Sequence, residues 1–325
     1  MSAKPVTDQT IGFKAAFLAP KHWFTWVLFG LIGLASSLPR FISVKIGDGI
    51  GHLYRRVNAK RARIARINIG LCFPKLSEPE REQLVIDHFR YYGRSVIDFG
   101  LTWWASESRL ARLIKFNNAD SYLTLLKQRN VILLLPHMVG LDCGAGFAGS
   151  LHPSISMMKA TGDELVNWRL WKGRTRPDSM RVVMRSQGLR PLIRAAKKGI
   201  PCYYMPDQDF GENDLTVFAP FFGVPSSTLT TLSAMARLAN ARVVPIYPIM
   251  REDGQYEVTF DAPLENFPSG DAVADASRVN EVVEKCISLA PAQYMWTLQW
   301  FKTRPDGAAS PYLEAATKQT MLNRE

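Results

Sequence analysis

From Val131 onward the chain alternates short apolar runs with stretches of helical spacing, and this alternation constrains the fold more than any other feature. The runs are VILLLP (131–136), SISMM (154–158), VVM (182–184), PCYYM (201–205), VVPIYPIM (243–250) and YEVTF (256–260). Their hydrophobicity is continuous rather than alternating, which is typical of strands that are covered on both faces. The pattern therefore predicts an α/β fold in which helices flank a β-sheet.

An uncharged apolar run at residues 23–38 is bordered by Lys21 on one side and Arg40 on the other. A helix needs about 20 apolar residues to cross a bilayer, so this run either spans with help from its flanks or only dips into the membrane. A signal peptide is disfavoured because no small-residue cleavage site is clean. We expect residues 1–45 to be a retained membrane anchor and residues 46–325 to be one cytoplasmic domain; a buried core helix is the alternative.

Positive charge is concentrated beside this run. The formal net charge is +11, and residues 1–77 hold twelve Lys or Arg against two Asp. Residues 53–69 have the spacing of a basic helix, which would lie well on anionic lipid headgroups. A solvated basic face is the alternative.

A second basic zone covers residues 172–198, where nine Lys or Arg accompany a single acid, Asp178. Such a zone suits phosphate groups or an acidic carrier protein. Nucleic acid is disfavoured as a partner, because the zone lacks interleaved aromatic residues and fits no helix-turn-helix or zinc-finger spacing.

The four cysteines are scattered without a C-x-x-C pair, which indicates a reducing compartment. A zinc site built from His137, Asp142, Cys143 and His152 is disfavoured, because their spacing matches no metal motif. We therefore predict no bound metal.

His137 follows the first apolar run, and Asp142 follows it in an H-x4-D arrangement. A His at a strand end and an Asp at the start of the next helix can meet across the turn that Gly140 permits. The carboxylate would then keep one imidazole nitrogen protonated and leave the other as a general base. From these two residues alone, a structural histidine remains the better interpretation.

Two other motifs are discounted. Gly144, Gly146 and Gly149 match G-x-G-x-x-G but do not follow the strand directly, which favours close helix packing over a dinucleotide site. The segment 209–211 reads D-F-G, but no Gly-rich phosphate loop or H-R-D segment accompanies it.

Several short blocks occur together in one order along the chain. They are NIGLCFP (68–74) with ER (80–81), H-x4-D (137–142), GRTR (173–176), GLRPLIR (188–194) with KG (198–199), PDQDFG (206–211), VFAPFFG (217–223), QYMW (293–296) and FKTRP (301–305). In these blocks the chain resembles the late, or secondary, acyltransferases of lipid A biosynthesis, the lauroyl/myristoyl acyltransferase family.

The resemblance implies a mixed β-sheet flanked by helices, as in glycerolipid acyltransferases, with residues 46–325 as the acyltransferase domain. It also implies a protein of the bacterial inner membrane that faces the cytoplasm. Such a protein takes an acyl chain from acyl carrier protein and places it on the hydroxyl of a 3-hydroxyacyl chain of a lipid A precursor. No cofactor or metal is required.

By the same resemblance His137 would deprotonate the acceptor hydroxyl while Asp142 orients the imidazole. Arg174, Arg176 and Asp207 would bind substrate, with Arg174 on a lipid phosphate. Four phenylalanines would line the acyl groove or belong to the core; they are Phe210, Phe218, Phe221 and Phe222.

The chain departs from the family pattern at WTLQWFK (296–302), where family members tend to read W-x-H-R-R-F-K. This departure bears on the acceptor or on the chain preference. Two alternatives stay open beside the lipid A acyltransferase. One is a related membrane acyltransferase, or a thioesterase, that acts on another lipid; the other is a non-catalytic lipid-binding protein.

Overall fold

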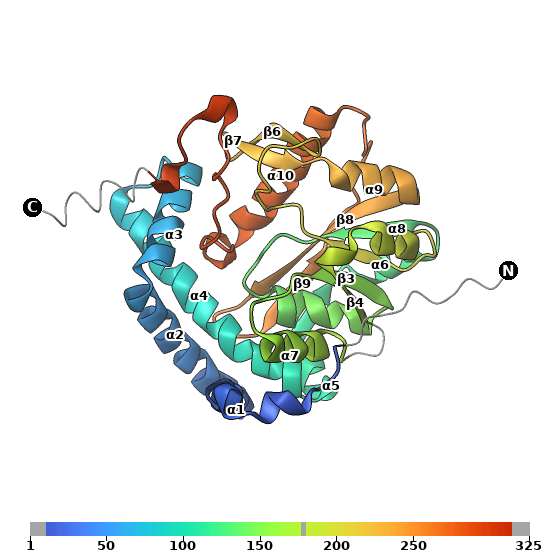
Figure 1. Ribbon diagram of the computed structural model, residues 1–325. Helices are drawn as coiled ribbons and strands as arrows, with labels where there is room; N and C mark the ends of the chain where they lie inside the picture. Colours follow the sequence, from blue (N-terminus) through green and yellow to red (C-terminus); the bar gives the residue numbers. More distant parts are fainter. Residues whose placement is uncertain (1–10, 177–179, 314–325) are drawn as a thin grey trace, which may run out of the picture.

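The computed structural model describes residues 11–176 and 180–313, so the first ten residues of the expected anchor and Asp178 lie outside the described residues. The described chain forms a seven-stranded sheet of order β1-β9-β8-β2-β5-β3-β4 and a two-stranded sheet, β6-β7 (Figure 1). All neighbouring strands of the larger sheet are parallel except β8 and β9. The strands are β1 (Ile114–Asn117), β2 (Asn130–Leu134), β3 (Ser154–Met158), β4 (Met180–Met184), β5 (Cys202–Tyr204), β6 (Thr216–Phe221), β7 (Val224–Leu229), β8 (Ala241–Met250) and β9 (Tyr256–Phe260).

Helices cover both faces of the larger sheet, and β2 shows how. Ile132 and Leu134 pack into one core with α3, α8, α9 and α10, whereas Val131 and Leu133 pack into another with α5 and α6. The predicted mixed sheet flanked by helices is therefore confirmed. The helices are α1 (Trp23–Ser37), α2 (Arg40–Val57), α3 (Ala59–Cys72), α4 (Glu78–Trp104), α5 (Glu107–Leu113), α6 (Ala119–Leu126), α7 (Glu164–Arg174), α8 (Arg190–Ala196), α9 (Thr231–Ala239) and α10 (Ala272–Leu289).

Helix α1 lies along the surface with one side against the protein. Phe29 and Ile32 are buried in a small core with Trp103 and Trp168, while Phe24 on the other side is 80% exposed. Within residues 11–176 and 180–313, no helix is both long enough and apolar enough to cross a membrane. The structure thus does not support an anchor that spans the membrane. One side of the apolar run at 23–38 packs against the protein, and the other side is exposed.

Helix α2 packs unusually close to α4, and glycines make this possible. A Cβ atom on Gly51 would lie 1.9 Å from the backbone oxygen of Phe89, and one on Gly93 would lie 2.1 Å from the oxygen of Gly47. No side chain fits there. The expected domain boundary after residue 45 falls inside α2, in the middle of this contact.

Buried ion pairs reinforce the same contact. Asp98 of α4 accepts hydrogen bonds from Arg40 at 2.7 Å and from the Tyr256 hydroxyl at 2.6 Å. Arg94 of α4 donates to Asp48 of α2 at 2.6 Å. These bonds join α2, α4 and the start of β9.

The basic stretch 53–69 is two helices rather than one. Asn58 separates α2 from α3, and its side chain caps α3 by accepting from the Arg61 backbone N–H at 3.1 Å. Arg66 pairs with Glu82 at 2.7 Å, and Arg61 donates to the backbone oxygen of Thr297. Part of the predicted lipid-facing charge is therefore used within the protein.

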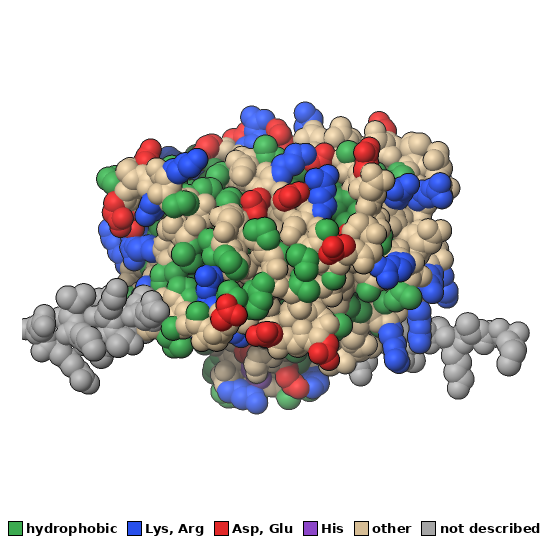
Figure 2. All heavy atoms as spheres, turned by 90° about the horizontal axis from the view of Figure 1, so that it is seen from above, with side chains coloured by type: hydrophobic (Ala, Val, Ile, Leu, Met, Phe, Trp, Pro, Cys, Tyr) green, Lys and Arg blue, Asp and Glu red, His purple; other side chains and the backbone are tan. Residues whose placement is uncertain are grey.

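The face that includes β6, β7 and α10 is seen from above in Figure 2. Acidic and basic side chains are intermingled there with apolar ones.

The sequence pattern does not predict three of the strands. They are the two strands of the β6–β7 hairpin and β1, which is short and half polar.

Candidate active site

Two neighbouring strands place His137 and Asp207 at the same edge of the sheet. β2 and β5 pair in parallel from Ile132 with Cys202 to Leu134 with Tyr204. His137 and Asp207 each follow at the third position beyond the strand end. Open α/β sheets bind their ligands at the carboxyl ends of their strands, so this edge is the expected location for a site.

The two side chains form a tight pair. The Asp207 carboxylate accepts from His137 Nδ1 at 2.7 Å and from the His137 backbone N–H at 2.7 Å. Asp207 is 4% exposed and His137 is 12% exposed. Because a carboxylate only accepts, Nδ1 carries a proton, and in the neutral imidazole the lone pair is then on Nε2. The imidazole is therefore held in the tautomer that a general base needs.

Gln208 contacts the other side of the imidazole, with its Nε2 at 3.1 Å from His137 Nε2. The Gln208 amide must donate here, since His137 Nε2 can only accept in this tautomer. Its carbonyl oxygen then faces the Arg185 guanidinium at 3.5 Å. In this structure the amide caps the lone pair of the base.

Asp142 does not hold the imidazole, and this prediction needs correction. Asp142 lies on a π-helix (Leu141–Ala145), and its carboxylate accepts from Arg174 Nε at 2.5 Å and from Arg174 Nη2 at 3.0 Å. The bonds that the structure gives to the His137 side chain come from Asp207 and Gln208. The turn after His137 leads Asp142 toward α7, whereas the neighbouring strand supplies the carboxylate.

The two predicted arginines are engaged with the protein. Burial lowers the pKa of Arg174, but the paired Asp142 carboxylate more than offsets this and leaves the pKa raised. Arg176 donates to the backbone oxygens of Thr102 and Ala105 at the end of α4. Arg174 borders the cavity described next, and Arg176 ties the end of α7 to α4.

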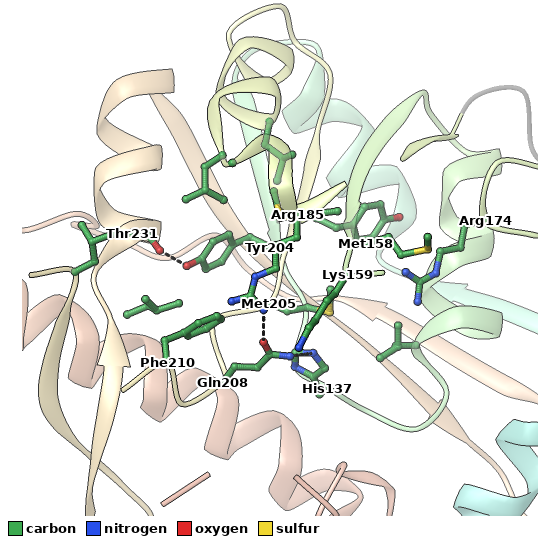
Figure 3. Close-up of a pocket in the computed structure, with 18 of the residues that line it drawn as sticks. His137, Met158, Lys159, Arg174, Arg185, Tyr204, Met205, Gln208, Phe210 and Thr231 are labelled. Atoms are coloured by element: carbon green, nitrogen blue, oxygen red, sulfur yellow. Dashed lines mark hydrogen bonds between the residues drawn. The ribbon is translucent and has the colours of Figure 1, made fainter. Parts of the chain in front are cut away.

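A cavity of about 560 Å³ opens beside His137 (Figure 3). Apolar side chains form most of its wall, and in Figure 3 Gln208 lies beside His137 while Arg174 and Thr231 lie on opposite sides of the view. Phe210 is in this wall, whereas Phe221 is buried in the core and Phe222 packs against it. The apolar lining comprises Leu141, Met157, Met158, Leu170, Leu189, Leu192, Met205, Phe210, Leu215 and Leu229.

The PDQD segment carries more of the site than sequence reasoning assigned to it. Asp209 accepts from the Thr303 backbone N–H at 2.6 Å and from the Thr303 hydroxyl at 2.7 Å. Asp209 thus joins two of the recognised blocks, 206–211 and 301–305. Gln208 lies between the two aspartates, and its position next to Asp207 was the available signal for a role at the base.

Tyr294, from the QYMW block, completes the buried side of the pair. Burial and the nearby Asp207 carboxylate raise the pKa of Tyr294 well above its ordinary value. Trp300 stacks on Tyr294 at 5.1 Å between ring centroids, and its ring lies 5.9 Å from that of His137. The departure from the family pattern at 296–302 therefore lies beside the base.

No group of three His, Cys, Asp or Glu in the described ranges is arranged to hold a metal ion. The four cysteines are free and buried. Of the four residues considered for zinc, Asp142 is paired with Arg174, and His152 Nδ1 lies 2.9 Å from the carbonyl oxygen of Pro153.

Comparison with known proteins bears on this geometry. The sequence model of the family described as bacterial lipid A biosynthesis acyltransferase matches residues 10–303. The chain belongs to this family. The predicted resemblance is confirmed, together with the acyltransferase activity and the role in lipid A biosynthesis that describe the family.

Individual relatives of this lipid A acyltransferase family match over nearly their whole length. The chain is 35% identical over 303 residues to the lipid A biosynthesis lauroyltransferase of Escherichia coli K12. This alignment covers 92% of this chain and 98% of that protein. It is 35% identical over 299 residues to a lipid A biosynthesis acyltransferase of Haemophilus influenzae, covering 90% and 95%. It is 31% identical over 304 residues to the lipid A biosynthesis palmitoleoyltransferase of E. coli K12, covering 93% and 98%.

Proposed function

We propose that this lipid A acyltransferase moves a fatty acyl chain from acyl carrier protein to the hydroxyl of a 3-hydroxyacyl chain on a lipid A precursor, with His137 as the general base. The observation that carries the proposal is the His137–Asp207 pair beside the 560 Å³ cavity. The relatives named for lauroyl and palmitoleoyl transfer support a fatty acyl group.

The chemistry follows from the tautomer. The acceptor hydroxyl replaces the Gln208 amide at His137 Nε2 and gives its proton to that nitrogen as its oxygen attacks the thioester carbonyl carbon. Asp207 stabilises the imidazolium that forms. The tetrahedral intermediate then expels the thiolate, which takes the proton from His137. A thioester is already activated, so the enzyme mainly supplies proximity and a base.

The cavity suits the hydrocarbon chains of both substrates. Its apolar wall would take an acyl chain out of water at about 25 cal/mol per Å² of apolar surface buried. A single methylene then contributes only about 0.8 kcal/mol, so small packing changes in this wall would alter chain preference.

The membrane contact that we propose is interfacial, at the inner membrane with the body of the protein on the cytoplasmic side. Helix α1 is packed on one side, and its other side exposes a row of large apolar residues. Such a helix lies in the headgroup region with its apolar face toward the acyl chains. The exposed residues are Trp23, Phe24, Val27, Leu28, Leu31 and Leu34.

The test of the function is acyl transfer from acyl carrier protein to a tetra-acylated lipid A precursor, scored by mass spectrometry. Wild type should add the mass of one acyl chain, and His137→Ala should remove this gain. His152→Ala is the matched control, because His152 precedes β3 at the opposite end of the sheet.

Other outcomes discriminate between the alternatives. If wild type hydrolyses the thioester without acylating the precursor, the acceptor assignment is wrong and the protein is a thioesterase or acts on another lipid. If His137→Ala transfers at the wild-type rate, His137 is not the base.

The membrane proposal has its own test in vesicle flotation. Phe24→Ser with Leu31→Ser should reduce binding to vesicles that contain anionic lipid, since two apolar side chains no longer enter the interface. Leu238→Ser is the control, because Leu238 is 56% exposed on α9, away from α1. If the variant with Phe24→Ser and Leu31→Ser bound vesicles as well as the Leu238→Ser control does, the proposal would be contradicted.

A further inference from the structure

Two cations in the cavity wall have no carboxylate partner. The lining includes Lys159, Arg174 and Arg185 but no Asp or Glu. Arg174 is neutralised by Asp142. Among the residues that the structure describes, neither Lys159 nor Arg185 forms an ion pair. The wall therefore offers two positive charges that are not compensated by the protein.

Their placement follows from the sheet. β3 and β4 pair in parallel up to Met158 with Met184, so Lys159 and Arg185 leave the ends of adjacent strands side by side. Both side chains point into the cavity in Figure 3. The strand register thus fixes the two charges next to each other at the edge of the sheet that carries His137.

The Arg185 guanidinium is already oriented. Its Cζ lies over the Phe210 ring, 4.4 Å from the ring centroid, and its Nη1 is 3.5 Å from the Gln208 side-chain carbonyl oxygen. Stacking on an aromatic face holds the guanidinium plane and leaves donors for an anion. Lys159 is exposed, and its ammonium group adds a compact positive charge with three N–H donors beside the Arg185 guanidinium.

We propose that Lys159 and Arg185 form a binding site for a phosphate group of the substrate. A guanidinium beside an ammonium suits the oxygens of a phosphate ester, and charge-assisted bonds to phosphate are strong. The inference rests on the proposed function, in which both substrates carry phosphate. The donor carries a phosphodiester in its phosphopantetheine arm, and the acceptor carries phosphates on its sugars. This pair takes the role that the sequence suggested for Arg174.

The experiment compares substrates that differ only in phosphate. The donors are acyl-phosphopantetheine and acyl-pantetheine, and the acceptors are the phosphorylated precursor and its dephosphorylated form. The variants are Lys159→Gln, Arg185→Gln and the double substitution. Arg181→Gln is the control, because Arg181 is exposed on β4 but does not line the cavity.

For the substrate whose phosphate is bound, each substitution should raise KM about tenfold, the effect of losing one charge-assisted hydrogen bond. The increase should vanish when the same substrate lacks its phosphate. If the increase in KM vanishes when the donor lacks its phosphate, the site binds the pantetheine phosphate. If the increase vanishes when the acceptor lacks its phosphates, the site binds a lipid phosphate. Arg181→Gln should leave all KM values within about twofold of wild type.

Because Arg185 also contacts Gln208, its substitution can alter kcat through the base. Lys159→Gln keeps the test clear, since among the described residues no hydrogen bond or ion pair joins Lys159 to Gln208 or to His137. An equal KM ratio of variant to wild type with and without phosphate, for both substrates, would overturn the proposal. Absence of acyl transfer by wild type would instead overturn the proposed function.

Discussion

Two carboxylates each hold one residue of the cavity wall, and the two residues that they hold differ in kind. Asp207 is 4% exposed and accepts from a histidine, whose ring can gain and lose a proton. Asp142 is 17% exposed and accepts from Arg174, whose guanidinium stays charged. The first pair can take part in proton transfer, whereas the second can only fix positions. The partner of each carboxylate, rather than its distance along the chain from His137, sets its role.

Among substitutions that test this comparison, we expect the largest loss of kcat from a change at Asp207. Asp207→Asn should lower kcat about 10⁴-fold, the loss seen when the carboxylate of a Ser–His–Asp triad becomes an amide, because the amide no longer enforces the Nδ1–H tautomer. The measurement is kcat for acyl transfer beside a thermal melt. A kcat within tenfold of wild type, in a folded variant, would show that Asp207 is not needed for proton transfer.

An intermediate effect is expected at the Asp142–Arg174 pair. Asp142→Asn and Arg174→Gln should each reduce the free energy of unfolding by about 1–3 kcal/mol, because each leaves a largely buried polar partner poorly satisfied. The double variant should cost less than the sum of the two. Urea unfolding of the four proteins measures this coupling.

The same variants compare the two pairs directly. Asp142→Asn should lower kcat less than Asp207→Asn does, since it loosens the π-helix after His137 without removing the partner of the imidazole. A loss of kcat equal to that of Asp207→Asn, at wild-type stability, would instead make Asp142 a catalytic residue.

The smallest expected effect is at Gln208. Gln208→Ala uncovers His137 Nε2, so hydrolysis of the donor thioester without acceptor should rise about 3- to 10-fold, the worth of one hydrogen bond. Release of free thiol reports the rate. Gln83→Ala, an exposed glutamine on α4, is the control. Unchanged hydrolysis would mean that the amide does not limit access of water to the base.

The sequence predicted several strands from short runs rich in apolar and β-branched residues. The run at 154–158 matches β3, and that at 256–260 matches β9. It also placed His137 at a strand end. These features are local, because they depend on residues within one element. The break at Asn58, which divides the basic stretch into two helices, also depends on local sequence, because Asn is a preferred residue at the N-cap of a helix.

The partner of His137 could not be read in the same way. Asp207 is 70 positions away and reaches the base only because β5 is the neighbour of β2. Strand order depends on how the whole sheet assembles, and no spacing within 137–142 reports it. The same holds for α1, where hydrophobicity alone does not tell a face packed on Trp103 from a face in contact with lipid.

The close contact of α2 with α4 has a practical consequence for handling the enzyme. Deleting the chain through Val57 would remove Arg40 and Asp48, which pair with the buried Asp98 and Arg94. Losing one partner of a buried ion pair costs about 3–5 kcal/mol, comparable to the whole stability of many domains. A variant that weakens the membrane contact proposed above is therefore better obtained by placing polar residues on the exposed side of α1 than by shortening the chain.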